Sequence, residues 1–192
     1  MKIANASPED ASLIADAILA AVGDEISDGL AGDRCSREDV HDLFMRLASR
    51  KDTQYSYTNA RIARTDSGRP MGVCVSYDGA ELKRLRVHFF HEACTTLGWK
   101  MTSEEMDNFP GETDSDEFYL DTLMVLPEFR GQGIGRALID DARNRARAAG
   151  KPLGLLCDKD NVKARHLYES CGFRCMGERL FAGTVMDHLQ IT

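Results

Sequence analysis

An apolar run over residues 118 to 126 (FYLDTLMVL) is followed by three glycines at alternate positions and then by a helical pattern. The run has the composition of a strand that is buried on both faces. Gly131, Gly133 and Gly135 stand at the start of the helix, where one Ser or Asp cap would ordinarily serve. Because glycine costs backbone entropy, three of them here indicate a turn whose backbone must stay bare.

A bare turn before a helix is typical of an anion-binding site. The helix start presents unpaired N–H groups and the positive end of the macrodipole, and a ligand's oxygens can reach them when side chains are missing. Arg130 and Arg136 add positive charge, so we expect a phosphate or pyrophosphate. The dinucleotide pattern G-x-G-x-x-G fails because Arg136 stands where the last Gly should be, and no Lys follows to complete a P-loop.

Composition excludes several classes of protein. The chain has 192 residues, 43% of them apolar and 29% charged, which is the balance of a single globular domain. No apolar run is long enough to cross a bilayer, and the first residues lack a signal-peptide pattern, so we expect a cytoplasmic protein with no membrane partner. The net charge of −7 argues against nucleic acid as the main partner.

The cysteines and histidines do not predict a metal site. The 6 cysteines are scattered without a CxxC pair, as reduced core thiols are. Cys171 and Cys175 could meet a metal together with Cys157, but no second ligand pair has the usual spacing. His88 and His91 resemble half of a metal site and lack a third ligand. We therefore expect no metal.

The remaining periodicity predicts one α/β domain without repeats or linkers. A loop rich in Gly and Asp is expected over residues 23 to 32. Helices are expected to start at Ser7, Ser36 and Thr102 and to cover residues 80 to 97, the segment ending near 149, and 161 to 171. Further strands are expected at residues 2 to 5, 55 to 64, 71 to 77, 153 to 157, 173 to 181 and 184 to 190.

Two motifs carry a resemblance to a known family. LDTLMVLPEFRGQGIGRALIDDA resembles the acetyl-coenzyme A-binding core of the GNAT superfamily of N-acetyltransferases, whose signature R/Q-x-x-G-x-G/A matches residues 130 to 135. Downstream, NVKARHLYESCGF matches the family pattern N-x-x-A-x-x-L-Y-x-x-x-G-F. The match is close over the C-terminal third and looser before it. It implies a GNAT fold over residues 1 to 192: a mixed, mostly antiparallel twisted sheet of six to seven strands, flanked by helices.

The resemblance implies acetyl-coenzyme A as co-substrate. The N–H groups of residues 131 to 136 would hold its pyrophosphate, and the strand backbone at residues 123 to 125 would pair with the pantetheine amides and polarise the thioester carbonyl. In the family this strand and the next splay apart to admit the cofactor arm. The implied binding residues are Leu123, Met124, Val125, Arg130, Gly131, Gln132, Gly133, Ile134, Gly135, Arg136, Asn161, Ala164 and Tyr168.

Asn161 and Tyr168 are seven residues apart, so they share a helix face and lie about 10 Å apart along its axis. By the resemblance, Asn161 would bind the coenzyme, and Tyr168 would lie beside the sulfur and protonate the leaving thiolate. The alternative is a half-buried core tyrosine whose hydroxyl merely finds a partner.

An attacking amine must be neutral, and an alkylamine with a pKa of about 10 is mostly protonated at neutral pH. Something must therefore take its proton. Tyr119, Asp121 and Leu123 are expected to share one face of their strand. The family often has Glu at the position of Tyr119, so Asp121 is the candidate base, with Glu117 behind it. Alternatively, Asp121 is structural and water takes the proton.

Residues 79 to 117 form an insertion that smaller family members lack. Residues 101 to 129 contain no Lys or Arg and many acids, which indicates either a solvated acidic loop or a funnel for a cationic acceptor. The insertion could overhang the acceptor cleft or form a dimer surface.

The sequence thus predicts an acetyl-coenzyme A-dependent N-acetyltransferase that modifies a primary amine on an unidentified small molecule or peptide. Four alternatives stay open: a non-catalytic acyl-coenzyme A sensor, a protein N-terminal or lysine acetyltransferase, a transferase of longer acyl groups, and a structural domain. A homodimer is left open as well.

Overall fold

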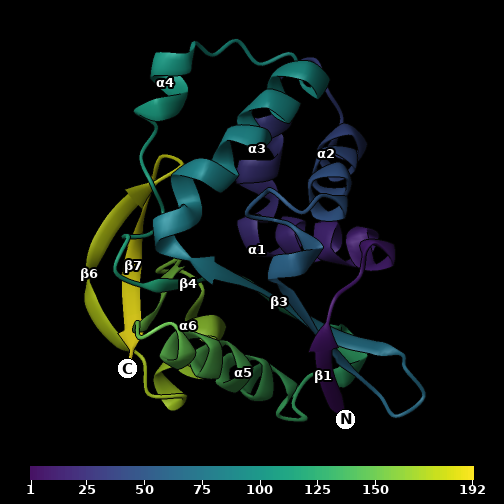
Figure 1. The fold of residues 1–192 in the computed structure, drawn as a ribbon, viewed down its shortest axis with the longest axis vertical. Coiled ribbons are helices and arrows are strands. Elements are labelled where there is room, and N and C mark those ends of the chain that lie inside the picture. The colour runs from purple at the N-terminus through teal and green to yellow at the C-terminus, as the bar shows by residue number, and fades with distance from the viewer.

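The computed structural model describes all residues from 1 to 192. A seven-stranded sheet with strand order β1-β2-β3-β4-β5-β7-β6 forms its centre. Only β4 and β5 run parallel, and every other neighbouring pair is antiparallel. This sheet confirms the predicted fold class (Figure 1). The strands are β1 (Lys2–Asn5), β2 (Ala60–Arg64), β3 (Pro70–Asp78), β4 (Phe118–Val125), β5 (Leu153–Cys157), β6 (Arg174–Phe181) and β7 (Thr184–Ile191).

Helices cover both faces of the sheet. Figure 1 shows α1, α2 and α3 on one side and α5 with α6 on the other. The layers enclose two main cores, one of 20 buried residues on the α1–α3 side and one of 16 on the α5 side. None of the helices is long and apolar enough to span a bilayer. The helices are α1 (Ala11–Ala31), α2 (Arg37–Ser49), α3 (Leu82–Thr96), α4 (Ser103–Asp107), α5 (Ile134–Ala148) and α6 (Val162–Ser170).

β3 lies inside the sheet between β2 and β4, and its side chains are apolar on both faces. Val73 and Val75 belong to the core on the α1–α3 side, whereas Met71 and Cys74 belong to the core on the α5 side. β4 begins in the same way, with Phe118 to Leu120 buried. The apolar run at residue 118 is therefore a central strand, as predicted.

Hydrogen bonds confirm two predicted helix starts. The Ser36 N–H donates to the Asp39 carboxylate at 2.7 Å, and the Asp39 N–H donates to Ser36 Oγ at 3.2 Å. Thr102 and Glu105 make the same reciprocal pair at the start of α4, at 2.7 and 3.2 Å. Each pair satisfies N–H groups that a helix start leaves without partners.

The loop predicted over residues 23 to 32 is wrong. The chain stays helical to Ala31, with a kink at Gly23, where φ is 77° and ψ is 175°. Ser27 and Ala31 are buried in the second half of α1, and Leu30 packs against the core. Burial of this face outweighs the weak helix propensity of Gly and Asp.

The strand predicted from residue 55 begins only at Ala60. Tyr57–Asn59 form a turn of 3-10 helix, in which Ser56 Oγ accepts a hydrogen bond from the Thr58 N–H at 3.0 Å. The Tyr55 ring instead meets Phe44 of α2 edge-on, with 5.1 Å between ring centroids. The alternation that suggested an early strand start therefore reflects packing against helices.

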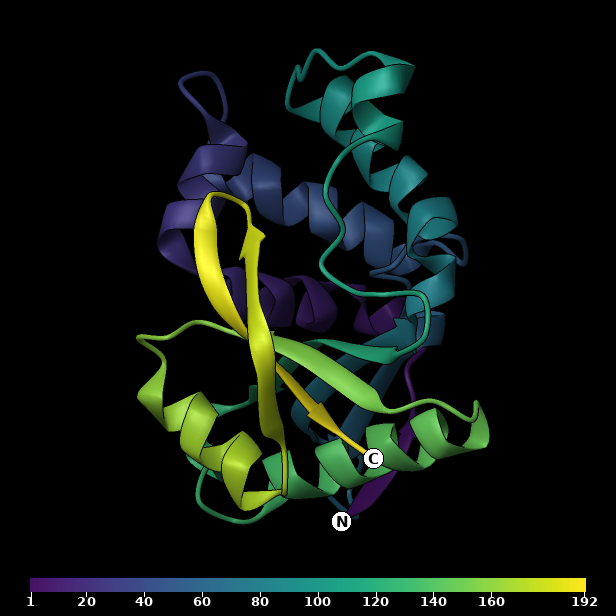
Figure 2. The same ribbon diagram turned by 90° about the vertical axis from the view of Figure 1, so that its left-hand side faces the viewer.

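The insertion between β3 and β4 forms α3 and α4. Phe90 and Ala93 of α3 are buried in the core on the α1–α3 side. The β6–β7 hairpin lies beside this insertion and extends beyond the rest of the sheet, and its tip reaches the level of α1 in Figure 2. The insertion and the hairpin tip both line one cavity with α1, which is described below.

Candidate active site

The turn before α5 exposes its backbone. Gly131 and Gly133 have φ values of 74° and 79°, which residues other than glycine rarely adopt. At either glycine, no atom lies within 4 Å of the position that a Cβ would take. The Ala137 N–H donates to the Gly133 carbonyl at 3.1 Å, so the N–H groups of residues 134 to 136 precede the first helical bond. These groups are free to bind an anion.

Gly135 is glycine for a different reason. A Cβ there would come within 3.3 Å of Leu167 Cδ2 on α6 and 3.7 Å of Val125 Cγ2 on β4. Its missing side chain lets α5 pack closely against both elements. Only its N–H remains available to a ligand.

A groove of about 480 Å³ lies beside this turn. We call it the glycine-turn groove, and three basic residues line it. Arg130 Nε donates to the Val125 carbonyl at 3.1 Å and Arg136 to the Ser170 carbonyl at 3.0 Å, whereas Lys163 has no hydrogen bond. The lining of the glycine-turn groove comprises Ala20, Leu123, Met124, Val125, Phe129, Arg130, Gly131, Gly133, Ile134, Gly135, Arg136, Lys163, Ala164, Leu167 and Tyr168.

Sequence reasoning missed Lys163, although it stands inside the second motif. Its place in the first turn of α6, two residues after Asn161, was the available signal. A side chain from a different helix therefore adds positive charge to the groove.

β4 and β5 separate at this groove. They pair only at Phe118 with Leu153 and at Tyr119 with Gly154. Beyond Tyr119, no strand pairs with this edge of β4, so its backbone is available to an extended ligand. This splaying agrees with the geometry that the resemblance implied.

β4 also carries a bulge. Its register with β3 shifts by one residue after Val75, which leaves Asp121 as the extra residue. Tyr119 packs with α3 residues on one face of the sheet, and Leu123 packs on the α5 side. The prediction that Tyr119, Asp121 and Leu123 share one face is therefore wrong, because the added residue reverses the alternation.

Asp121 and Tyr168 line one cavity of about 300 Å³, which we call the central cavity. It shares Ala20, Leu123, Ala164 and Tyr168 with the glycine-turn groove, so the two hollows adjoin at Tyr168. The kink in α1 supplies one wall. The other lining residues are Ala21, Val22, Gly23, Asp24, Glu25, Ile26, Leu156, Cys157, Asp158, Asn161, Thr184 and Met186.

Tyr168 is half-buried where the groove and the central cavity adjoin. Its ring meets Phe173 edge-on, with 5.6 Å between ring centroids, and no group of the protein bonds its hydroxyl. Burial raises the pKa of Tyr168 above its ordinary value. The phenol is therefore protonated at neutral pH and has a proton to donate.

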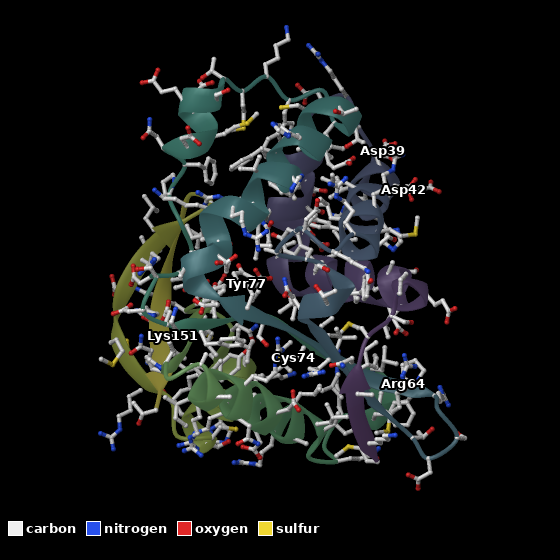
Figure 3. The ribbon with its side chains drawn as sticks, in the orientation of Figure 1. Asp39, Asp42, Arg64, Cys74, Tyr77 and Lys151 are labelled. Atoms are coloured by element: carbon white, nitrogen blue, oxygen red, sulfur yellow. The ribbon has the colours of Figure 1, made fainter.

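Asp121 belongs to a cluster of three polar side chains in the interior. Tyr77 Oη lies 3.0 Å from Asp121 Oδ2 and 3.0 Å from Glu112 Oε1, yet a phenol can donate to only one of them at a time. Figure 3 labels Tyr77, which lies in the interior near the start of α3. Burial and the charge of Glu112 raise the pKa of Asp121 to about 7, and burial also raises the pKa of Glu112. Asp121 therefore titrates near neutral pH, as a general base should.

Neither Tyr77 nor Glu112 was among the residues chosen from the sequence. Glu112 belongs to the acidic run, but it is buried beside Arg86, whose Nη1 lies 3.6 Å from Glu112 Oε2. Tyr77 is an ordinary strand residue by its pattern. Only the pairing of β3 with β4 brings it to Asp121.

Two predicted coenzyme-binding residues have other contacts. Asn161 Oδ1 accepts a hydrogen bond from the Ala164 N–H at 3.1 Å, which caps α6, and Asn161 lines the central cavity rather than the groove. Gln132 Nε2 donates to the Glu128 carbonyl at 3.3 Å, and Gln132 does not line the groove.

Glu117 lines neither the groove nor the central cavity. Burial alone would raise its pKa, but hydrogen bonds outweigh burial and lower the pKa to about 2. A Cβ at Gly154 would overlap the Glu117 carboxylate, so β5 makes room for this carboxylate only because position 154 is glycine. Glu117 therefore joins neighbouring segments instead of facing a ligand. Its bonding partners are Thr113, the Asp114 N–H, His188 and Gln190.

The residues considered for metals lie apart. His88 Nε2 lies 3.2 Å from Asp52 Oδ2, and all cysteines are free. No group of three or more His, Cys, Asp or Glu side chains is arranged to hold a metal ion.

These features define a class of protein. A bare helix start, a free strand edge beside it, and a phenol and a carboxyl that line one cavity fit an enzyme that binds a phosphate-bearing ligand. The profile of the acetyltransferase (GNAT) family matches residues 33–173, so the chain belongs to the GNAT family. Acetyl transfer from acetyl-coenzyme A is the reaction of that family.

Solved structures agree with this assignment. A crystal structure of an acetyltransferase is 29% identical, covers 99% of this chain and 98% of its own, and has a TM-score of 0.73. An N-acetyltransferase from Staphylococcus aureus Mu50 is 20% identical over 100% of both chains, with a TM-score of 0.77. Histone acetyltransferase HPA2 and related acetyltransferase from Corynebacterium glutamicum is 18% identical over 98% and 94%, with a TM-score of 0.64. The last two share the fold. Comparison with curated proteins gave no match.

Proposed function

We propose that this chain is an N-acetyltransferase that moves the acetyl group of acetyl-coenzyme A directly to a primary amine. The observation that carries the proposal is the position of Tyr168, which lines both the glycine-turn groove and the central cavity containing Asp121. A donor in the groove and an acceptor in the central cavity would meet beside it.

The groove fits the coenzyme. The N–H groups of residues 134 to 136, the open positions at Gly131 and Gly133, and the charges of Arg130, Arg136 and Lys163 suit a pyrophosphate. The free edge of β4 at residues 123 to 125 suits the amides of the pantetheine arm. When bound, acetyl-coenzyme A supplies an acetyl group activated as a thioester.

Each side chain then has one task. Asp121 accepts the proton of the incoming amine, and Tyr77 links it to Glu112, which spreads that proton over a buried network. Tyr168 donates its proton to the departing sulfur. Tyr77 and Glu112 are positioning residues, because they reach the reaction only through Asp121.

Cys157 also lines the central cavity, which raises the question of an acyl-cysteine route. Burial raises the pKa of Cys157 to about 11, so its thiol is protonated at neutral pH. A protonated thiol is a poor nucleophile, which supports direct attack by the amine.

The test is release of free thiol from acetyl-coenzyme A in the presence of a panel of primary amines, alongside thermal melting with coenzyme A. We expect both an amine-dependent release of thiol and a rise in melting temperature. Stabilisation without thiol release from any amine would instead favour an acyl-coenzyme A sensor. No stabilisation at all would overturn the proposal.

A further inference from the structure

A third cavity, of about 540 Å³, adjoins the central cavity, and the family signature does not account for it. Five segments enclose it: the second half of α1, α2 with the loop after it, α3, the loops around α4, and the tip of the β6–β7 hairpin. We call it the aromatic cavity. Its lining is Val22, Glu25, Ile26, Gly29, Leu30, Phe44, Gln54, Tyr55, Arg86, Phe89, Phe90, Trp99, Phe109, Glu112, Phe181, Ala182 and Thr184.

Six of the lining rings form one connected cluster. Phe89 is at its centre, with ring centroids 5.9 Å from Trp99, 5.6 Å from Phe90 and 6.1 Å from Tyr55. Phe90 continues to Phe109 at 5.3 Å, and Phe44 joins Tyr55 and Phe89. Walls of this kind bind flat apolar groups through face and edge contacts. The volume lies within the range of about 300 to 1,000 Å³ that small-molecule sites occupy.

One polar atom in this wall has no hydrogen-bond partner. Gln54 is 2% exposed, and its Oε1 makes no hydrogen bond. A buried acceptor left unpaired costs free energy, so such groups in folded proteins nearly always have a partner. Since Gln54 lines the cavity, a ligand that carries an N–H or O–H donor would supply that partner.

The aromatic cavity adjoins the site of chemistry. It shares Val22, Glu25, Ile26 and Thr184 with the central cavity. Glu25 is exposed and forms no ion pair, so at this junction its charge attracts a protonated amine. A ligand whose body occupies the aromatic cavity would therefore place its amine toward Asp121.

The charges of the cavity do not suit a polyamine. The only acids that line the cavity are Glu25 and Glu112. The charge of Arg86 offsets that of Glu112, and Arg86 also donates hydrogen bonds to the Phe109 and Pro110 carbonyls. Most acids of the run over residues 101 to 129 lie elsewhere, since α4 is exposed and Glu117 is held by its own partners. Glu25 matches one protonated amine, and a second cationic centre would find no unpaired carboxylate in this cavity.

We propose that the aromatic cavity is the acceptor site and that the acceptor is a primary amine on an aromatic body that carries a hydrogen-bond donor. This rests on the proposed function. The amine nitrogen forms its bond to the acetyl carbon as the carbon–sulfur bond breaks. The protonated amine gives one proton to Asp121 before it attacks. The sulfur takes the proton of Tyr168, and the resulting phenolate takes the second proton that the nitrogen loses as the amide forms, which restores Tyr168.

The protein contains a built-in reporter, because Trp99 is its only tryptophan and lines this cavity. Phenethylamine, tyramine and spermidine are titrated in the presence of coenzyme A, which has no acyl group to transfer. Trp99 emission is followed with excitation at a wavelength that phenols do not absorb. We expect both aromatic amines to change the emission and to bind at least about tenfold more tightly than spermidine.

Tyramine and phenethylamine differ by one hydroxyl, which tests the Gln54 contact. Tyramine is expected to bind about fivefold more tightly, the effect of roughly 1 kcal/mol from one satisfied buried acceptor. Gln54→Met, of similar shape, should abolish this preference. If the parent protein binds the two amines equally well, the acceptor needs no hydrogen-bond donor for Gln54, and that part of the proposal is wrong.

A cavity-filling variant tests the location. Gly29 lines the aromatic cavity, and a Cβ at this helical position would meet no atom within 4 Å. Gly29→Leu should therefore fold and weaken binding of the aromatic amines about tenfold or more. Glu38→Leu, which places the same side chain at an exposed position outside the cavity, is the matched control.

The outcomes separate this inference from the proposed function. Coenzyme A that stabilises the protein, together with no response of Trp99 to either aromatic amine, overturns the inference alone. Spermidine that binds as tightly as the aromatic amines also overturns the inference alone. Absence of stabilisation by coenzyme A, with an aromatic amine still bound, overturns the proposed transferase instead.

Discussion

The glycine-turn groove and the aromatic cavity adjoin the same central cavity, but the chain builds them in opposite ways. Most residues of the groove come from two short segments, 123 to 136 and 163 to 168. The aromatic cavity draws on residues from Val22 to Thr184, in five separate segments. The groove is thus a local structure, and the aromatic cavity exists only when the whole domain has folded.

This difference matches a division of labour. A pyrophosphate needs bare N–H groups at a helix start, which a few consecutive residues can supply. An acceptor needs a shaped wall, which helices from distant parts of the chain must bring together. Substitutions in the groove should therefore affect reaction with every acceptor, and substitutions in the aromatic cavity should affect the choice among acceptors.

The sharpest test of this division is Tyr168→Phe. Loss of the phenolic proton should lower kcat by about 10²- to 10⁴-fold for every amine. The rise in melting temperature with coenzyme A should remain, because the helix start is unchanged. Thiol release under saturating substrates measures the effect. A variant as fast as the parent would remove Tyr168 from the mechanism.

Asp121→Asn should lower kcat/KM about 10²-fold. For the parent protein, kcat/KM should rise with pH through about 7, as Asp121 loses its proton, and this limb should be missing in the variant. A variant that retained the limb would assign it to another group. Rates across a pH series distinguish these results.

Asp121 should also affect stability. Its pKa in the folded protein is about 7, above the roughly 3.9 of an unfolded chain, so the unfolded state loses this proton first. The free energy of unfolding should therefore decrease as pH rises from about 4 to about 7, by at most about 4 kcal/mol. Urea unfolding of Asp121→Asn should show a shallower decrease. An identical pH profile would contradict burial of a neutral Asp121.

Gly133→Ala tests the groove against a matched control at the other end of α5. Gly133 and Gly150 have φ values of 79° and 70°, and a Cβ at either would meet no atom within 4 Å. Both alanine variants should lose about 1 kcal/mol of stability. Only Gly133→Ala should weaken coenzyme A, by about tenfold, because its Cβ would cover the N–H groups. Equal coenzyme binding by both variants would separate the glycine turn from the ligand.

The smallest effect is expected at the mouth of the aromatic cavity. Ala182, at the tip of the β6–β7 hairpin, has a φ of 48°, which is unfavourable for a residue with a Cβ. Ala182→Gly should relieve this strain and stabilise the fold by up to about 1 kcal/mol. Thermal melting measures it. A loss of stability would mean that the alanine methyl contributes packing that outweighs the strain.

The homodimer that the sequence leaves open stays untested. Met176, Leu180 and Val185 of the hairpin are 62%, 63% and 45% exposed, respectively. They lie on the last two strands, at the edge of the sheet. Such a surface is where a second copy would be expected to pack.

The sequence by itself predicted the fold class, the bare turn before α5, the central strand β4 and the family. It could do so because hydrophobic period, helix capping and glycine spacing act over a few neighbouring residues. It erred where distant contacts override local preference. The second half of α1 is helical because its inner face is buried, and the bulge at Asp121 reverses the expected alternation.

Only the tertiary structure decided which groups surround Asp121 and what an acceptor would meet. Tyr77 and Glu112 reach Asp121 through strand pairing and the return of the insertion to the sheet. The aromatic wall forms because α2 and α3 bring their rings to one place beside Gln54. No spacing along the chain encodes such contacts, since they depend on how whole elements pack.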